Sequence, residues 1–144
     1  MALPTALAEI AEDFNALPEP QRLELLLEFS HNLPELPERY QDAELEQVIE
    51  CQSPVFLTVE VADDADRTVG VFITAPPEAP TTRGFAGVLV EGLHGLPAEE
   101  VLETPDDYPS TIGLARAVSP LRLRGMTAML GRIKNRVRKE LADA

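Results

Sequence analysis

The chain has 144 residues, of which 44% are hydrophobic and 26% charged, so its size and composition predict one soluble globular domain over residues 1–144. Its net charge of −13 argues against general nucleic-acid binding, because contacts with phosphates need a positive surface. Apolar runs are too short to cross a bilayer and the N-terminus lacks a basic start, so we expect a cytoplasmic protein that binds neither membranes nor nucleic acids.

Two amphipathic helices are predicted first, separated by the helix-breaking stretch LPEP at residues 17–20. The residues of their inward faces recur at helical spacing and are Leu3, Leu7, Ile10, Phe14, Leu23, Leu26, Leu27 and Ser30. Pro34 and Pro37 then prevent a regular helix. We therefore expect an extended connection or a very short turn at this point.

Residues 55–74 predict an antiparallel hairpin. From Val55 to Val61, and again from Val69 to Ile73, large apolar side chains occupy alternate positions, which is the period of a half-buried strand. The acidic stretch ADDADR between the two runs predicts a polar turn. It lacks the glycine and the distal glutamate of an EF-hand loop, so we expect no calcium site there.

Helices are predicted again after the hairpin. The proline-rich stretch TAPPEAPTTRG at residues 74–84 predicts a loop that ends where the next helix begins. GFAGVLVEGLHG then predicts a helix buried against the hairpin, and LPAEEVLE predicts a short one. Helices gathered around a short antiparallel sheet make an α+β domain.

A long final helix is expected to begin with Ser119 as its N-cap and Pro120 in its first turn. Its predicted inward face consists of Leu121, Met126, Met129, Leu130, Ile133, Val137 and Leu141. Most of the basic residues then fall on its outward face. Residues 116–144 hold 8 basic and 2 acidic side chains, whereas residues 1–115 hold 4 basic and 23 acidic ones. This basic end is either a solvated helix face or a docking surface for an acidic partner.

Cys51 is the single cysteine of the chain and lies just before the first predicted strand. Unpaired cysteine is commonly a small core residue. Here its neighbours Glu50, Gln52, Ser53 and Pro54 are polar or turn-forming, so the segment has the composition of a loop, and loops on rigid scaffolds often carry reactive groups. One thiol can form neither an intrachain disulfide nor a cysteine-rich metal site, and we predict no metal.

Several blocks of the sequence, in order, resemble one family. CQSPVFL at residues 51–57, TTRGFAGVLVEGLHGLPAEEVL at residues 81–102 and VSPLRLRGMTAMLGRIK at residues 118–134 are similar to the SufE family of sulfur acceptors. LPELPERY at residues 33–40 also fits. The resemblance implies an α+β fold of the SufE/NifU (IscU-like) type, a short antiparallel β-sheet with helices packed on it and the acceptor loop at one end of the sheet.

The resemblance also implies a function in iron–sulfur cluster assembly. In the SufE family the cysteine of the CQS motif takes sulfur as a persulfide from a PLP-dependent cysteine desulfurase, stimulates that enzyme, and passes the sulfur to a cluster scaffold. On this chain the acceptor would be Cys51. The residues expected to support it or to contact a partner are Gln52, Ser53, Glu78, Arg83 and Gly84.

The resemblance further implies a SufS-like desulfurase and a SufBCD-like scaffold complex as partners. PLP belongs to the desulfurase, and this chain is expected to hold no cofactor of its own. We expect a monomer or weak dimer that acts as a persulfide carrier and desulfurase activator rather than as a stand-alone enzyme.

Transfer depends on the ionisation of Cys51, because the thiolate is the nucleophile. Neighbouring Glu50 favours the neutral thiol, whereas a cation such as Arg83, if folded close, would favour the thiolate; the sequence leaves this balance open. A second cysteine would attack the persulfide and release sulfide, so the lone thiol protects its cargo. The family commonly has glycine where Glu50 stands, and we expect Glu50 to limit the movement of the loop.

Two alternatives stay open. In the first, the chain is a non-catalytic interaction module that docks through its basic C-terminal helix, with Cys51 inert. In the second, it is a single-cysteine redox protein, which needs a Cys51 of low pKa that peroxide oxidises to a sulfenic acid.

Overall fold

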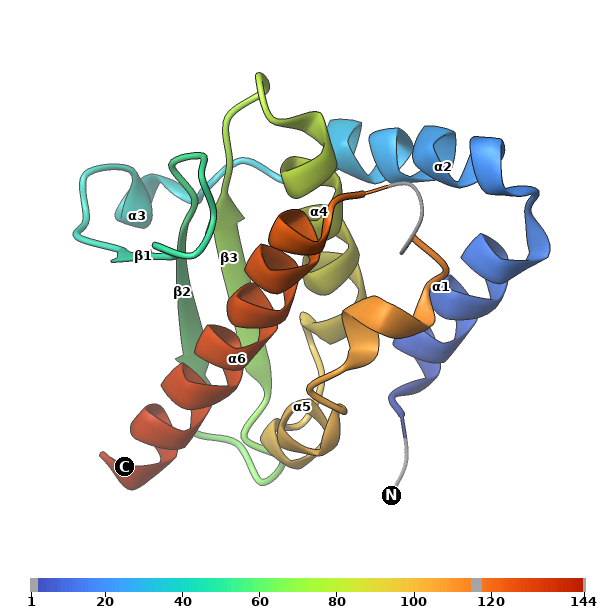
Figure 1. Ribbon diagram of the computed structural model, residues 1–144. Helices are drawn as coiled ribbons and strands as arrows, with labels where there is room; N and C mark the ends of the chain where they lie inside the picture. The colour runs from blue at the N-terminus through green and yellow to red at the C-terminus, as the bar shows by residue number, and fades with distance from the viewer. Residues whose placement is uncertain (1–2, 115–117, 144) are drawn as a thin grey trace.

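A computed structural model describes residues 3–114 and 118–143 and places helices around a small antiparallel sheet (Figure 1). The helices are α1 (Thr5–Ala16), α2 (Glu19–His31), α3 (Glu38–Gln41), α4 (Pro80–Leu93), α5 (Ala98–Glu103), the 3-10 helix η1 (Tyr108–Thr111) and α6 (Pro120–Ala142). The strands are β1 (Glu46–Gln47), β2 (Phe56–Val61) and β3 (Val69–Thr74), hydrogen-bonded in the order β1-β2-β3. The predicted α+β class is confirmed.

The predicted hairpin is formed by β2 and β3. Leu57 lies opposite Ile73 and Val59 opposite Val71, and all four side chains are buried. Helix α6 packs against β2 and α4 packs against β3. Because alternate residues of a strand point to opposite faces, the apolar period seen in the sequence places one face of the hairpin under these two helices, where the core lies.

Strand β1 is an element that the sequence does not predict. Glu46 pairs with Leu57 and Gln47 with Phe56, so β1 forms an edge of the sheet. Two polar residues are too short a run to show a strand period. The pairing matters for function because it ties the segment that leads to Cys51 to the sheet.

Helix α4 begins earlier than predicted. It starts at Pro80, within the stretch that the sequence assigns to a loop. Proline is well suited to a first helical position, where its missing N–H has no partner to lose. As a result, Arg83 and Gly84 lie inside the helix, and a Cβ on Gly84 would collide with the Leu26 carbonyl oxygen of α2. Glycine at this position is what lets α4 and α2 approach so closely.

The expected inward face of α6 is largely confirmed. Ser119 caps the helix by accepting a hydrogen bond from the Arg122 N–H at 3.2 Å. Leu141 is partly buried, but Leu121 is 41% exposed, so its assignment to the inward face is wrong. The buried members of the predicted face are Met126, Met129, Leu130, Ile133 and Val137. Within the described residues, none of the helices combines the length and apolar character needed to span a membrane.

Most of the basic residues of α6 face outward as predicted, since Arg122, Arg124, Arg138 and Lys139 are exposed, but three others turn toward the protein. Lys134 is buried and donates hydrogen bonds to the Thr104 carbonyl and to Asp106, each at 2.7 Å. Arg132 and Arg136 form ion pairs with acidic residues of the β1 segment. The reason is that α6 contacts α5 and η1 as well as β2, so a wider arc of the helix is covered than its apolar stripe indicates.

Replacing Gly84 by alanine should destabilise the protein. The new methyl group would meet the Leu26 carbonyl and force α2 and α4 apart, which we expect to lower the free energy of unfolding by about 1–3 kcal/mol. Gly131→Ala in α6 is the matched control: its Cβ meets nothing within 4 Å, and the gain in helix propensity should raise stability by about 1 kcal/mol. Urea denaturation of both variants checks this, and a stable Gly84→Ala variant would contradict the close packing.

Candidate functional site

Cys51 lies in the loop between β1 and β2, as the composition of the segment predicts. Both ends of the loop are fixed by buried valines, since the Val48 N–H donates to the Val55 carbonyl at 2.8 Å and neither side chain is exposed. Within the loop, the Cys51 N–H donates to the Val48 carbonyl at 3.1 Å and forms a turn. The thiol therefore projects from a rigid base.

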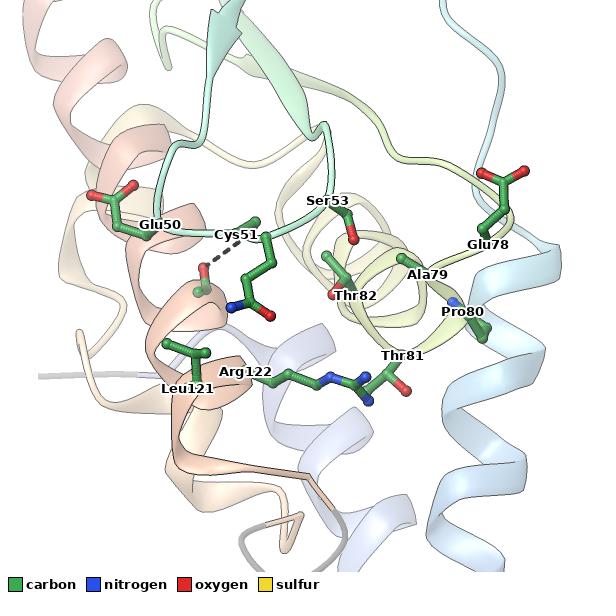
Figure 2. Close-up of a pocket in the computed structure, with 12 residues that line it drawn as sticks. Glu50, Cys51, Ser53, Glu78, Ala79, Pro80, Thr81, Thr82, Leu121 and Arg122 are labelled. Carbon is green, nitrogen blue, oxygen red and sulfur yellow. Dashed lines mark hydrogen bonds between the residues drawn. The ribbon is translucent and has the colours of Figure 1, made fainter.

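The thiol of Cys51 lies against α6. It is half-buried, and its Sγ donates to the Gly125 carbonyl oxygen at 3.7 Å (Figure 2). A Cβ on Gly125 would lie only 3.1 Å from this Sγ. Gly125 is thus the residue that lets the sulfur approach the helix, and the sequence analysis missed it because a glycine inside a helix shows what it contacts only after folding.

A pocket of about 240 Å³ opens beside Cys51. It forms where the Cys51 loop, the beginning of α4 and the first turns of α6 meet (Figure 2). Of the residues predicted to accompany Cys51, the structure brings Gln52, Ser53 and Glu78 to this pocket. The further lining residues are Glu50, Ala79, Pro80, Thr81, Thr82, Leu121, Arg122 and Gly125.

Arg122 is a pocket residue that sequence reasoning did not single out. In Figure 2 its side chain extends from α6 toward Thr81 on the α4 side of the pocket. The available signal was its place in the block VSPLRLRG, three residues after the helix cap Ser119. Together with Glu50 and Glu78 it gives the pocket charges of both signs.

Arg83 and Gly84 are not among the described residues that line the pocket. The Arg83 guanidinium donates instead to the Ser30 carbonyl at 3.0 Å and to the Ala75 carbonyl at 2.6 Å, so it fastens α4 to α2 and to the end of β3. The idea that Arg83 supports the thiolate therefore fails, because the early start of α4 directs this side chain elsewhere. The cation that acts on Cys51 is Arg132.

Burial raises the pKa of Cys51 to about 11, the negative charge of Glu50 contributes to this rise, and Arg132 opposes it. In the balance that the sequence leaves open, burial and Glu50 outweigh Arg132 and favour the neutral thiol. At neutral pH the resting protein holds a protonated, weakly nucleophilic sulfur.

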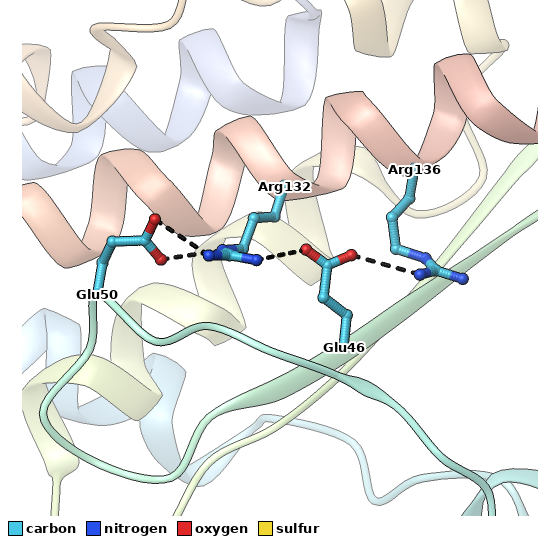
Figure 3. A network of polar contacts seen from close by, with 4 residues as sticks. All are labelled: Glu46, Glu50, Arg132 and Arg136. Carbon is cyan, nitrogen blue, oxygen red and sulfur yellow. Dashed lines mark hydrogen bonds and ion pairs between the residues drawn. The ribbon is translucent and has the colours of Figure 1, made fainter.

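An ion-pair network joins the Cys51 loop to α6 (Figure 3). Arg132 donates to both carboxylate oxygens of Glu50, at 2.9 and 3.1 Å, and to Glu46 at 2.7 Å. Glu46 also accepts a hydrogen bond from Arg136 at 3.3 Å. These bonds from Arg132 lower the pKa of Glu50 and keep it ionised. The only sequence signal for this network was a spacing of four residues, between Glu46 and Glu50 and again between Arg132 and Arg136.

Cys51 carries the single thiol of the chain, and no histidine accompanies it among the described lining residues of the pocket. His94 accepts a hydrogen bond from the Val71 N–H at 3.0 Å and is not among the described lining residues, so it forms no catalytic pair with Cys51. Within the described residues, no group of three or more His, Cys, Asp or Glu side chains could hold a metal ion. Fold and site together define an α+β protein that presents one sheltered thiol in a small polar pocket.

Comparisons with known proteins place this arrangement in a family. The family model SufE, described as an Fe-S metabolism associated domain, matches residues 8–137. An uncharacterised SufE-like protein of Mycobacterium tuberculosis is 49% identical over 138 residues, which cover 96% of this chain and 95% of that protein. The chain therefore belongs to the SufE family and has a role in Fe–S metabolism.

Two further proteins are similar to this chain. The solution structure of a hypothetical protein from Thermus thermophilus superposes with a TM-score of 0.85 at 40% identity, covering 98% of this chain and 99% of that one. The cysteine desulfuration protein SufE of Plasmodium falciparum is 24% identical over 88 residues, which cover 61% of this chain and 35% of that protein.

Alkylation of Cys51 should require a higher pH in the native protein than in the unfolded protein, because the thiol is half-buried. Iodoacetamide reacts with the thiolate, so its rate follows the ionised fraction. In the native protein the rate should rise with a half-point near the raised pKa of about 11, and in urea-unfolded protein near the ordinary value of 9.0. A native half-point at or below the unfolded one would refute the burial of the thiol.

Replacing Gly125 by alanine should loosen the contact between the Cys51 sulfur and α6. The added methyl group would displace the sulfur from α6, and alkylation at mildly alkaline pH should accelerate about tenfold for each unit by which the pKa falls. Gly131→Ala makes the same change on the same helix without touching the loop and should react like the wild type. Equal rates for the two variants would mean that the Gly125 contact does not govern the thiol.

Proposed function

We propose that Cys51 is a persulfide acceptor and carrier in iron–sulfur cluster assembly. The observation that carries this proposal is the position of the single thiol: the cysteine of the CQS motif lies in a pocket, half-buried against α6, on a chain of the SufE family. A carrier needs a reactive sulfur, room beside it for one more sulfur atom, and shelter from solvent. The pocket supplies the room and the shelter beside that sulfur.

The proposed step is an exchange without net oxidation. The Cys51 thiolate attacks the outer sulfur of a persulfide on the donor protein, a new S–S bond forms at Cys51, and the bond to the donor cysteine breaks. The electron pair of the broken bond leaves with the donor thiolate. The proton of the resting thiol must first be removed, because burial and Glu50 keep Cys51 neutral.

The proposed partners follow from the family. Membership implies interaction with a cysteine desulfurase, and we propose a SufS-like enzyme as the donor and a SufBCD-like scaffold complex as the recipient. PLP would reside in the desulfurase, while this chain would work in the cytoplasm without a cofactor of its own, stimulating the desulfurase by removing its product sulfur. Gln52, Ser53 and Glu78 line the pocket, which supports the proposal that they contact the docked partner.

The two alternatives receive less support from the geometry. A docking module would use a free basic helix face, but Arg132, Lys134 and Arg136 are engaged within the chain, which leaves it Arg122, Arg124, Arg138 and Lys139. A redox sensor would need a thiol of low pKa, whereas the pKa of Cys51 is raised.

Intact-mass analysis tests the proposal directly. After incubation with a PLP-dependent cysteine desulfurase and free cysteine, the protein should gain the mass of one sulfur atom, and a reductant should remove it. Cys51→Ser is the control and should gain nothing. Absence of the adduct with several desulfurases, while the protein remains folded, would exclude the acceptor role.

A further inference from the structure

In the middle of the Cys51 loop, an ion pair from Glu50 accompanies the contact of the Cys51 sulfur with Gly125. Val48 and Val55 fix its two ends, while Ile49 is 71% exposed and Gln52 and Pro54 are also exposed. Between them, Glu50 is held by both of its carboxylate oxygens on Arg132. Glu50 directly precedes Cys51 in the sequence. Its bidentate pair with Arg132 therefore links the Cys51 loop to α6, the helix that the sulfur contacts.

The network around Arg132 has an anchored end and an exposed end. Glu46 belongs to β1 and is held by strand pairing with Leu57 as well as by its arginines. Its side chain is 24% exposed, whereas that of Glu50 is 37% exposed. Ions compete most readily for the more exposed partner, so the Glu50–Arg132 pair is the one that opens first.

We propose that the Glu50–Arg132 pair is an electrostatic latch that positions Cys51. When the pair is closed, residues 49–54 lie on α6 and the sulfur rests against Gly125; when it opens, the loop leaves the helix and the thiol is exposed. The use of the latch in sulfur transfer rests on the function proposed above. Its opening and closing are properties of this chain alone.

The latch is suited to release by a docking protein. A partner that offers a carboxylate to Arg132, or a cation to Glu50, replaces the broken ion pair with a new one. Opening the Glu50–Arg132 pair therefore costs little free energy when the partner is bound. A partly exposed pair of this kind shifts an equilibrium by about two- to fivefold. Opening is therefore within the reach of modest binding interactions.

If Arg132 is replaced by a neutral residue, the loss of its charge and the release of the latch predict opposite changes in the alkylation rate of Cys51. The charged groups around Cys51 are Glu50 on its own loop, Arg122 and Arg132 on α6, and Glu78 before α4. Arg132 lowers the pKa of Cys51 through its charge, so removing that charge from a loop that stays closed would raise the pKa and slow alkylation. If Arg132 is the latch, its removal opens the loop, relieves the burial and speeds alkylation.

The test is iodoacetamide alkylation of Arg132→Gln across a range of pH. We expect a rate about two- to fivefold above the wild type at mildly alkaline pH, with the half-point shifted from about 11 toward 9.0. Arg132→Lys keeps the charge but loses the bidentate geometry and should give an intermediate rate. Arg138→Gln, an exposed residue of α6 that contacts Asn135, is the matched control and should leave the rate unchanged.

Slower alkylation of Arg132→Gln, or a rate equal to that of the wild type, would overturn the latch. Circular dichroism checks that the variant is folded. If the variant is unfolded, the test is made on the wild type instead. Rising NaCl concentration should speed alkylation of wild-type Cys51 at fixed pH, and a rate independent of salt would overturn the proposal. None of these measurements uses a desulfurase, so a failed sulfur transfer with a working latch would reject the proposed function alone.

Discussion

The packing of α6 on β2 is the contact on which the rest of the structure depends. The apolar residues of this helix cover the buried face of the hairpin, and other parts of it contact α5 and η1. Its first turns close one side of the pocket and bring Gly125 to Cys51, and its later turns carry the arginines that hold the β1 segment. A shift of α6 relative to β2 would therefore disturb the core, the pocket and the ion-pair network together.

Burial and reactivity oppose each other at Cys51. The contact with α6 that shelters the sulfur also keeps it protonated, so oxidants and donors alike meet a weak nucleophile. A carrier tolerates such a resting state if docking changes the environment of the thiol. Glu50 acts twice in this balance, because its charge raises the pKa of Cys51 and its carboxylate binds Arg132.

Local patterns in the sequence predict most of the fold. The alternation from Val55 to Ile73 predicts the hairpin, and Ser119 with Pro120 predicts the start of α6, because strand period and helix capping depend on neighbouring residues. The errors fall where tertiary contacts outweigh local signals. Strand β1 exists because β2 offers a free edge to two polar residues, and α4 extends to Pro80 through a stretch whose prolines predict a loop.

The sequence by itself determined the α+β class, the loop position of Cys51 and the resemblance to the SufE family. Only the tertiary structure decided which residues serve that cysteine. It assigned Arg83 to two backbone carbonyls, and it placed Gly125 and Arg132 beside the loop. Gly125 is 74 positions from Cys51, and Arg132 is 82 positions from Glu50. Period, capping and composition describe interactions over a few residues, whereas contacts at such separations form only when the helices and the sheet pack together.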